Sequence, residues 1–156
     1  MNATTERSIT VTINGTTYER EVEARKLLIH FVRDDLDLTG SHIGCDTGNC
    51  GACSLIVDGT LVKSCMMLAV QADGATIESV EGLADGDELN KLQNAFRDHH
   101  ALQCGYCTPG ILMSATALLR ANPHPSDDEI KKALQGNICR CTGYWNIFEA
   151  VKAATE

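Results

Sequence analysis

The sequence predicts an α+β protein, with strands in its first half and helices in its second. Three observations lead to this class. Apolar and polar residues alternate in short runs before residue 80, and Asn-Gly and Asp-Gly turns join two pairs of these runs. From about residue 89 onward, apolar residues recur at helical spacing. Eight cysteines fall into two groups, one in each half of the 156-residue chain.

The first half is expected to form a small sheet with one helix. Asn14-Gly15 is a strong hairpin signal, because both residues tolerate positive φ, and Asp58-Gly59 repeats the pattern further along. Apolar residues at helical spacing indicate one short helix between the hairpins. The expected strands are residues 8–13, 16–22, 54–57, 60–63 and 75–79, and the expected helix is residues 25–34.

The second half is expected to contain four helices. Ser126 and Glu129 form a capping box that predicts the start of one helix, and Gly136 predicts its end. Thr108 is expected as the N-cap of another helix, with Pro109 at its first position. The apolar stripes of the other two helices are Leu89, Leu92 and Phe96, and Ile147, Phe148 and Val151. The change of period divides the chain into domains at residues 1–82 and 83–156.

Composition and charge exclude several classes of function. The net charge of −8 argues against nucleic acid or an anionic membrane surface as a partner. No signal peptide and no membrane-spanning run is visible, so the chain is expected in the cytoplasm, with membrane association only through partners. Cysteines there serve more often as metal ligands than as disulfides. A disulfide framework is the weaker alternative, because a chain of this length can bury an apolar core.

The first cysteine group has the spacing of a plant-type [2Fe–2S] site. Cys45, Cys50 and Cys53 form C-x4-C-x2-C, and Cys65 follows further along the chain. Such a loop can curl around a cluster so that three thiolates point inward, while a neighbouring strand supplies the fourth. Glycines within the loop allow backbone N–H groups to approach the sulfur atoms. These glycines are Gly44, Gly48 and Gly51.

The second group is less specific. Cys104 and Cys107 form C-x2-C, whereas Cys139 and Cys141 form C-x-C. Four cysteines also suit zinc, so a zinc site stays open on spacing alone. The neighbouring plant-type site favours a second redox centre, because two adjacent centres can pass electrons. Residues 103–111 and 137–147 also echo each other, each placing a cysteine pair between two predicted helices.

The sequence shows no substrate site of a common type. It has no Gly-x-Ser-x-Gly elbow, no phosphate-binding loop and no dinucleotide fingerprint after a strand. The five histidines lack the pattern of a Rieske centre. His42 lies near the first cysteine loop and is expected to be solvated, whereas Met66 is expected in the core. The chain is therefore predicted to move electrons without binding a substrate.

Three segments resemble the small iron–sulfur subunit of the molybdenum hydroxylases, a group that includes xanthine dehydrogenase, aldehyde oxidoreductase and aerobic carbon monoxide dehydrogenase. The segments are GCDTGNCGAC at 44–53, QCGYCTPG at 103–110 and GNICRCTGY at 136–144. The resemblance covers about residues 9–153. It implies a plant-ferredoxin-like β-grasp domain followed by an all-α four-helix iron–sulfur domain, in agreement with the change of period.

The resemblance also implies partners. One is a large subunit whose molybdopterin cofactor hydroxylates the substrate; another is usually a medium subunit with FAD, replaced in some relatives by a cytochrome or quinone acceptor. The expected assembly is a hetero-oligomer of large, medium and small subunits, or its dimer. By this resemblance Gln103 corresponds to a glutamine that hydrogen-bonds the pterin, and Cys141 to the ligand lying against it. The helical-domain cluster is then nearer molybdenum, and the β-grasp cluster nearer flavin.

The resulting hypothesis is an electron relay from the molybdenum cofactor through the helical-domain cluster and the β-grasp cluster to FAD or another acceptor. The alternatives are a free-standing two-cluster ferredoxin or redox sensor, and a structural zinc protein. A soluble carrier needs no second buried centre, so the helical half disfavours the first alternative. Residues 27–53 are most similar to carbon monoxide dehydrogenase-type and N-heterocycle-hydroxylating enzymes, which leaves the substrate undecided.

Overall fold

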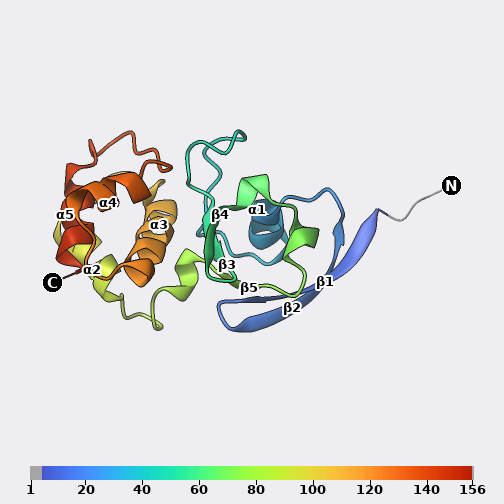
Figure 1. Ribbon diagram of the computed structural model, residues 1–156. Helices are drawn as coiled ribbons and strands as arrows, with labels where there is room; N and C mark the ends of the chain where they lie inside the picture. Colours follow the sequence, from blue (N-terminus) through green and yellow to red (C-terminus); the bar gives the residue numbers. More distant parts are fainter. Residues whose placement is uncertain (1–4, 156) are drawn as a thin grey trace.

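The computed structural model describes residues 5–155 and combines a five-stranded sheet with helices in this part of the chain (Figure 1). The strand order is β2-β1-β5-β3-β4. Two hairpins form the outer pairs, and β5 joins them, parallel to β1 and antiparallel to β3. The strands are β1 (Glu6–Ile13), β2 (Thr16–Glu23), β3 (Ser54–Val57), β4 (Thr60–Lys63) and β5 (Thr76–Glu78).

Both predicted hairpin turns are confirmed. Asn14 and Gly15 have φ of 50° and 82°, and Asp58 and Gly59 have φ of 47° and 78°. These are the left-handed conformations that a two-residue hairpin turn requires. The turns set the register in which Thr12 faces Thr17 and Val57 faces Thr60.

The predicted helix over residues 25–34 is wrong in its start and in its type. Helix α1 covers only Leu28–His30 and continues as a π-helical turn, η1 (Phe31–Asp35). The backbone just before α1 is engaged elsewhere: Lys26 O accepts from Ala69 N, and Leu28 N donates to Met67 O. These hydrogen bonds keep Leu27 extended, so the helix cannot begin earlier.

The second half contains the four expected helices, and Asn90 and Ser126 cap the first and third. Each cap forms a reciprocal capping box, with Gln93 and Glu129 respectively. Thr108 is not an N-cap as predicted, because it is the first residue of its helix and Cys107 takes the cap position. The helices are α2 (Lys91–Asp98), α3 (Thr108–Ala121), α4 (Asp127–Ala133) and α5 (Trp145–Ala153).

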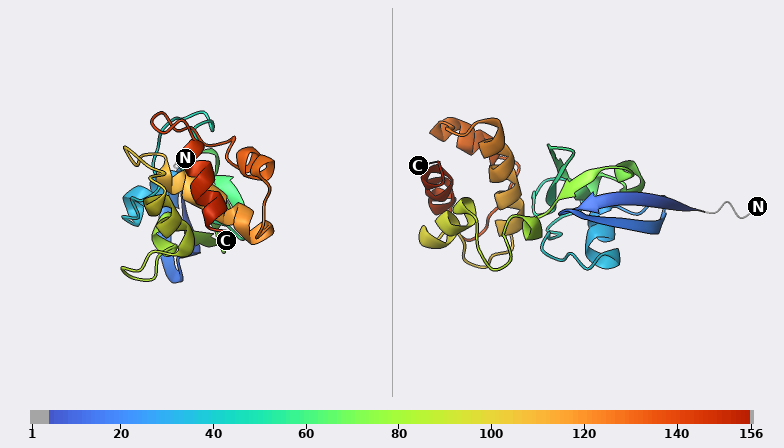
Figure 2. Two further views of the ribbon diagram at one scale, coloured as in Figure 1. Left: turned by 90° about the vertical axis from the view of Figure 1, so that its left-hand side faces the viewer. Right: turned by 90° about the horizontal axis from the view of Figure 1, so that it is seen from below.

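The four helices form two similar units. In each unit a helix with a capping box leads into a cysteine-containing loop and then into a second helix, giving α2–loop–α3 and α4–loop–α5. Helix α2 packs against α5, and α3 packs against α4. The views in Figures 1 and 2 place the loop before α5 at the same edge of the molecule as the loop before β3.

Two large hydrophobic clusters stabilise the described part of the chain. One lies between the sheet and α1, where Phe31, Leu55 and Ile77 are fully buried. The other lies among the four later helices and includes Phe96 and Ile147. Figure 2 shows the sheet-containing half and the helical half side by side along an elongated molecule. Within residues 5–155, none of the helices has the length and apolar character needed to cross a membrane.

Close backbone contact joins the two halves. Gly110 on α3 lies so near the loop before β3 that a Cβ there would be 2.1 Å from Gly51 O. Arg120, near the end of α3, forms a bidentate ion pair with Glu78 of β5, both N···O distances being 2.7 Å. The helical half therefore packs directly on β3 and β5.

Candidate metal centres

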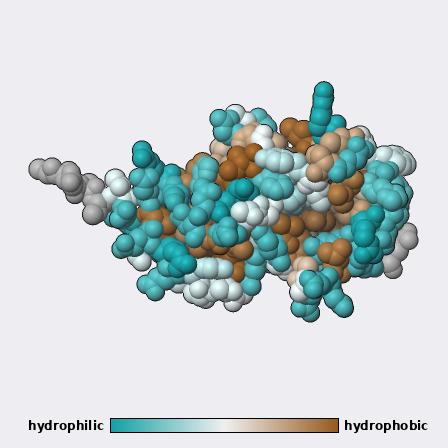
Figure 3. All heavy atoms as spheres, turned by 180° about the vertical axis from the view of Figure 1, so that it is seen from behind, coloured by the Kyte–Doolittle hydropathy of each residue, from teal (hydrophilic) through white to brown (hydrophobic). Residues whose placement is uncertain are grey.

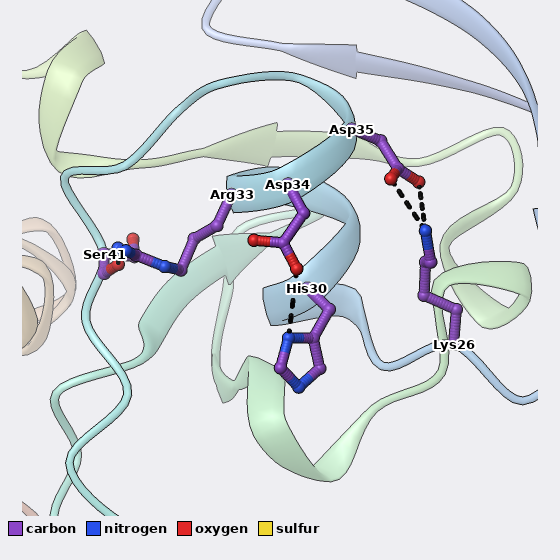
Figure 4. Close-up of polar contacts among 6 residues, drawn as sticks. All are labelled: Lys26, His30, Arg33, Asp34, Asp35 and Ser41. Atoms are coloured by element: carbon purple, nitrogen blue, oxygen red, sulfur yellow. Dashed lines mark hydrogen bonds and ion pairs between the residues drawn. The ribbon is translucent and has the colours of Figure 1, made fainter.

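The loop that leads to the first cysteine group is held by Arg33. Its guanidinium donates to the carbonyl oxygens of Thr39, at 2.6 Å, and of Ser41. On the other side of the same π-helical turn, Lys26 Nζ contacts both carboxylate oxygens of Asp35, at 2.7 and 2.8 Å (Figure 4). Because Arg33 lies on the turn η1, the turn fixes where the chain enters the cysteine loop.

The β3–β4 hairpin brings the fourth cysteine to the other three. Cys53 immediately precedes β3, and Cys65 lies in a short 3-10 helix, η2 (Ser64–Met66), directly after β4. Ser64 fastens this junction, since its backbone N–H and its hydroxyl both donate to Cys53 O, at 3.3 and 2.7 Å. Cys53 and Cys65 are buried, whereas Cys45 and Cys50 are half-buried.

The first four thiols meet in two pairs, Cys45 with Cys50 and Cys53 with Cys65. Cys50 N donates to Cys45 Sγ at 3.3 Å, and this backbone hydrogen bond is the main cause that lowers the pKa of Cys45 to about 6. Burial, together with the neighbouring Cys53 thiol, raises the pKa of Cys65 to about 11. The loop backbone therefore favours a thiolate at Cys45, while Cys65 needs a bound cation to ionise at neutral pH.

Glycines leave no spare room around these thiols. A Cβ at Gly44 would lie 3.0 Å from Cys50 Sγ, and a Cβ at Gly48 would lie 3.0 Å from Met66 Cγ. Lys63 Nζ donates to Gly48 O at 2.6 Å and so closes the loop from the β4 side. Met66 itself is 65% exposed, so its predicted place in the core is wrong.

The second cysteine group comes from the two loops of the helical half. Cys104 and Cys107 precede α3, and Cys139 and Cys141 precede α5. Cys107 meets Cys139 across the two loops, and burial, with this neighbour, raises the pKa of Cys107 to about 12. Cys139 is buried, whereas Cys104 and Cys141 are exposed.

Cys139 has a hydroxyl partner. Thr142 Oγ1 lies 3.1 Å from Cys139 Sγ. Burial alone would raise the pKa of Cys139, but hydrogen bonds from the Thr142 hydroxyl and backbone outweigh it and lower the pKa. The two cysteines that meet, Cys107 and Cys139, are therefore shifted in opposite directions.

The pairing of the thiols suits a two-iron cluster. A zinc site needs four sulfur atoms at about 2.3 Å from one centre. A [2Fe–2S] cluster has two irons and four cysteine ligands, so two thiols for each iron suit the two pairs of the first group and the meeting of Cys107 with Cys139 in the second. The Thr108 hydroxyl oxygen, directly after Cys107, is buried without a hydrogen-bond partner in the described residues, as expected beside an acceptor outside the chain.

The two cysteine loops are hydrogen-bonded to each other. Ile138 N donates to Cys50 O at 2.9 Å, and Asn137 Nδ2 donates to Gly51 O at 3.3 Å. The first bond joins the backbone of Cys50 to the residue just before Cys139. No motif indicated this contact, because a backbone hydrogen bond between distant segments depends on tertiary packing.

Tyr106 makes a second connection between the loops. Its hydroxyl donates to Ile43 O at 2.7 Å, and its ring stacks on His42 with centroids 4.6 Å apart. His42 Nδ1 donates to Tyr106 O at 2.8 Å, since a carbonyl oxygen only accepts. The prediction of a solvated His42 is therefore wrong: the histidine is half-buried and packs between the two cysteine loops.

Exposed apolar side chains surround the second cysteine group. Leu102 is 41% exposed, Tyr106 49% and Ile138 55%. Trp145, at the start of α5, is 69% exposed. Gln103, the residue between Leu102 and Cys104, is exposed as well. On the face drawn in Figure 3, groups of apolar residues lie between hydrophilic ones.

Two family models match the chain. A "2Fe-2S iron-sulfur cluster binding domain" matches residues 11–89, and a "[2Fe-2S] binding domain" matches residues 79–152. Together they span both cysteine groups, one in each matched region.

Curated relatives match over nearly their whole length. The gamma subunit of caffeine dehydrogenase from Pseudomonas sp. (strain CBB1) is 51% identical over 150 residues, covering 94% of this chain and 90% of the relative. The small subunit of nicotine 6-hydroxylase from Paenarthrobacter nicotinovorans is 54% identical over 143 residues, covering 92% and 86%. A chain of the crystal structure of quinoline 2-oxidoreductase from Pseudomonas putida 86 is 47% identical, with a TM-score of 0.94 and coverage of 97% and 95%.

Proposed function

The chain belongs to the small iron–sulfur subunits of the molybdenum hydroxylases, and we propose that it relays electrons between its two metal centres. They pass from the centre at the second cysteine group, here called the helical-half centre, to the centre at the first group, the sheet-half centre. It is an electron-transfer subunit of an oxidoreductase and has two [2Fe–2S]-binding domains. When bound, the clusters supply one-electron redox centres. The chain's own residues hold the two centres, fix their separation and tune them.

We assign the ligands as two sets of four. The paired thiols and the tight glycines of the first loop support the first set, and the meeting of Cys107 with Cys139 supports the second. The sheet-half set is Cys45, Cys50, Cys53 and Cys65, and the helical-half set is Cys104, Cys107, Cys139 and Cys141. We further propose the domain division at residues 1–82 and 83–156, with a plant-ferredoxin-like β-grasp domain before the four-helix domain.

The hydrogen bond from Ile138 N to Cys50 O is the observation on which the relay mainly rests. Cys50 is an assigned ligand of one centre, and Ile138 directly precedes Cys139, an assigned ligand of the other. The bond therefore connects the two loops directly through the backbone, without depending on a side chain. A packed contact of this kind keeps the two centres at one separation, which suits repeated electron transfer.

The direction of the relay follows from exposure. Cys104, Cys141 and Gln103 are exposed and lie among exposed apolar side chains, which suits burial against a large partner. We propose that this face binds a subunit with a molybdopterin cofactor. Gln103 and Cys141 would then lie on the side of the second centre that faces this cofactor. The sheet-half centre then delivers electrons to FAD in a medium subunit or to a cytochrome or quinone. The assembly is a cytoplasmic hetero-oligomer.

The substrate class proposed for the complex is a nitrogen heterocycle. The three relatives named above are called after caffeine, nicotine and quinoline, each of which contains such a ring. The substrate itself binds in the large subunit, so this chain contributes only the route by which electrons leave. Turnover of a panel of N-heterocycles, aldehydes and carbon monoxide by the native complex tests the class.

Two ligand substitutions in the whole complex test the order of the centres. Cys45→Ser should leave the helical-half cluster reducible by substrate, whereas Cys141→Ser should block reduction of the sheet-half cluster. Electron paramagnetic resonance of the substrate-reduced complex reports both. If Cys45→Ser alone abolishes reduction of the helical-half cluster, the proposed order is wrong.

Metal content and association test the rest. Two clusters require about four iron and four sulfide ions per chain, and stoichiometric zinc in their place would refute the cluster assignment. The native protein should elute with its partners in size-exclusion chromatography. A stable monomer that holds both clusters and binds no partner would instead support the free-standing carrier.

A further inference from the structure

We propose that the hydroxyl groups of Thr108 and Thr142 donate hydrogen bonds to sulfur atoms of the helical-half cluster and raise its reduction potential. The inference rests on the proposed ligation of that cluster by the second cysteine group. It adds two residues that are not ligands, and their effect is measurable as the reduction potential of the helical-half cluster.

The Thr142 hydroxyl has its hydrogen available for sulfur. Thr142 Oγ1 accepts a hydrogen bond from Tyr144 N at 3.1 Å and lies 3.1 Å from Cys139 Sγ. A hydroxyl has one hydrogen and two acceptor lone pairs, so accepting from Tyr144 leaves the hydrogen free. A thiolate bound to iron has no proton to donate. The bond must therefore run from the Thr142 hydroxyl to Cys139 Sγ when the cluster is in place.

The Thr108 hydroxyl has no hydrogen-bond partner among residues 5–155. Its oxygen is one of two buried side-chain polar atoms without a hydrogen-bond partner in residues 5–155. Thr108 directly follows Cys107 and is the first residue of α3, where it does not act as a cap. Buried hydroxyls are rarely left unpaired, so an acceptor from outside the chain is expected here. The assigned site offers an acceptor of this kind, a sulfur atom of the cluster that Cys107 would bind.

The two threonines occupy matching positions in the two helical units. Each directly follows the second cysteine of its pair, in Cys107-Thr108 and in Cys141-Thr142. Thr108 is the first residue of α3, and Thr142 lies in the loop that leads into α5. Since Cys107 meets Cys139 across these loops, the two hydroxyls approach one centre from both units. One-electron reduction adds negative charge to the cluster, and donors to its sulfur atoms stabilise that charge. The pair should therefore raise the reduction potential of the helical-half cluster above the value that it would have without the two hydroxyls.

Valine and serine substitutions test the proposal in the holoenzyme complex. Thr142→Val and Thr108→Val keep the shape of the side chain and remove the donor, whereas Thr→Ser keeps the donor and removes a methyl group. Redox titration followed by electron paramagnetic resonance gives the midpoint potential of each cluster. We expect each valine variant to lower the equilibrium constant for one-electron reduction of the helical-half cluster about tenfold, which corresponds to a midpoint potential lower by about 59 mV. The serine variants and the sheet-half cluster should stay within about threefold of wild type.

Three results would overturn the proposal: valine variants with wild-type potentials, equal shifts in both clusters, or serine variants that shift as far as valine. Iron and sulfide analysis separates this failure from failure of the proposed function. A fully loaded variant with an unchanged potential refutes only the role of the hydroxyls, whereas a wild-type chain without iron refutes the cluster assignment. If Thr142→Val does not assemble because Tyr144 N loses its acceptor, Thr108→Val decides alone, since that hydroxyl has no partner among residues 5–155 to lose.

Discussion

Gly110→Ala should separate the two halves of the molecule slightly and destabilise it. The added Cβ would lie 2.1 Å from Gly51 O and 2.9 Å from Ala52 Cα, whereas real Cβ contacts are essentially never shorter than 3.0 Å. Backbone atoms cannot rotate away as a long side chain can. Helix α3 must therefore move by at least about 0.9 Å from the loop that holds Cys50 and Cys53.

The magnitude follows from two opposing effects. Overpacking a close contact costs about 1–3 kcal/mol. Alanine in a helix recovers up to about 1 kcal/mol relative to glycine. The difference lies between about 0 and 3 kcal/mol, with a middle value of about 1.5 kcal/mol. At about 2–4 °C for each kcal/mol in a chain of this length, this middle value should lower the Tm by about 3–6 °C.

Gly136→Ala is the matched control for this experiment. Gly136 lies at the same junction, but its Cβ would meet only Lys63 Nζ at 3.4 Å and Cε at 3.6 Å, the far end of a flexible side chain. Thermal unfolding of the holoprotein compares the two variants, and electron transfer between the clusters should slow only in Gly110→Ala. Equal Tm values for both variants and wild type would show that α3 and the cysteine loop are not in such close contact.

Three further perturbations follow from the structure. Glu78→Gln should lower the free energy of unfolding by at most about 1 kcal/mol, because its partner Arg120 is half-exposed. Arg120 lowers the pKa of Glu78, so this contribution is present above pH 4.5 and disappears as the pH falls through the lowered pKa. Thermal unfolding curves of the variant and of wild type should therefore converge in acid. Arg33→Met removes the donors to Thr39 O and Ser41 O and should reduce iron in the sheet-half site, measured against an unchanged helical-half signal; equal loss from both sites would contradict a local role. Phe96→Ala, at 2% exposure, should cost about 3–5 kcal/mol by chemical denaturation, and a loss below 1 kcal/mol would place Phe96 outside the helical core.

The elements that depend on local chemistry were predictable from the sequence. Asn14-Gly15 and Ser126 with Glu129 act through neighbours only a few residues away, and both behave as expected. The helix at 25–34 was mispredicted because the backbone of Lys26 and Leu28 forms hydrogen bonds with residues 67–69 instead of within a first helical turn. Thr108 satisfied the local pattern of an N-cap, yet the helix begins one residue earlier than that pattern implies.

The two cysteine sets also differ in whether local sequence or tertiary packing brings their members together. Spacing alone predicted a cluster site at Cys45, Cys50 and Cys53, because one loop holds all three. The second set depends on the meeting of two loops that α3 and α4 separate in the sequence. The contact of Ile138 with Cys50, and of His42 with Tyr106, arises only when the two halves pack. The ligand sets, the domain division and the role of Gln103 stay predictions until metal and variants are measured.

The two similar helical units also determine the order in which the complex can be built. Cys107 of one loop meets Cys139 of the other, so neither unit alone offers a complete set of thiols. Under the proposed ligation, a cluster held by Cys107 and Cys139 would join the two loops that present Leu102, Gln103 and Ile138 to the outside. We therefore expect the cluster to be inserted before this surface binds the partner subunit.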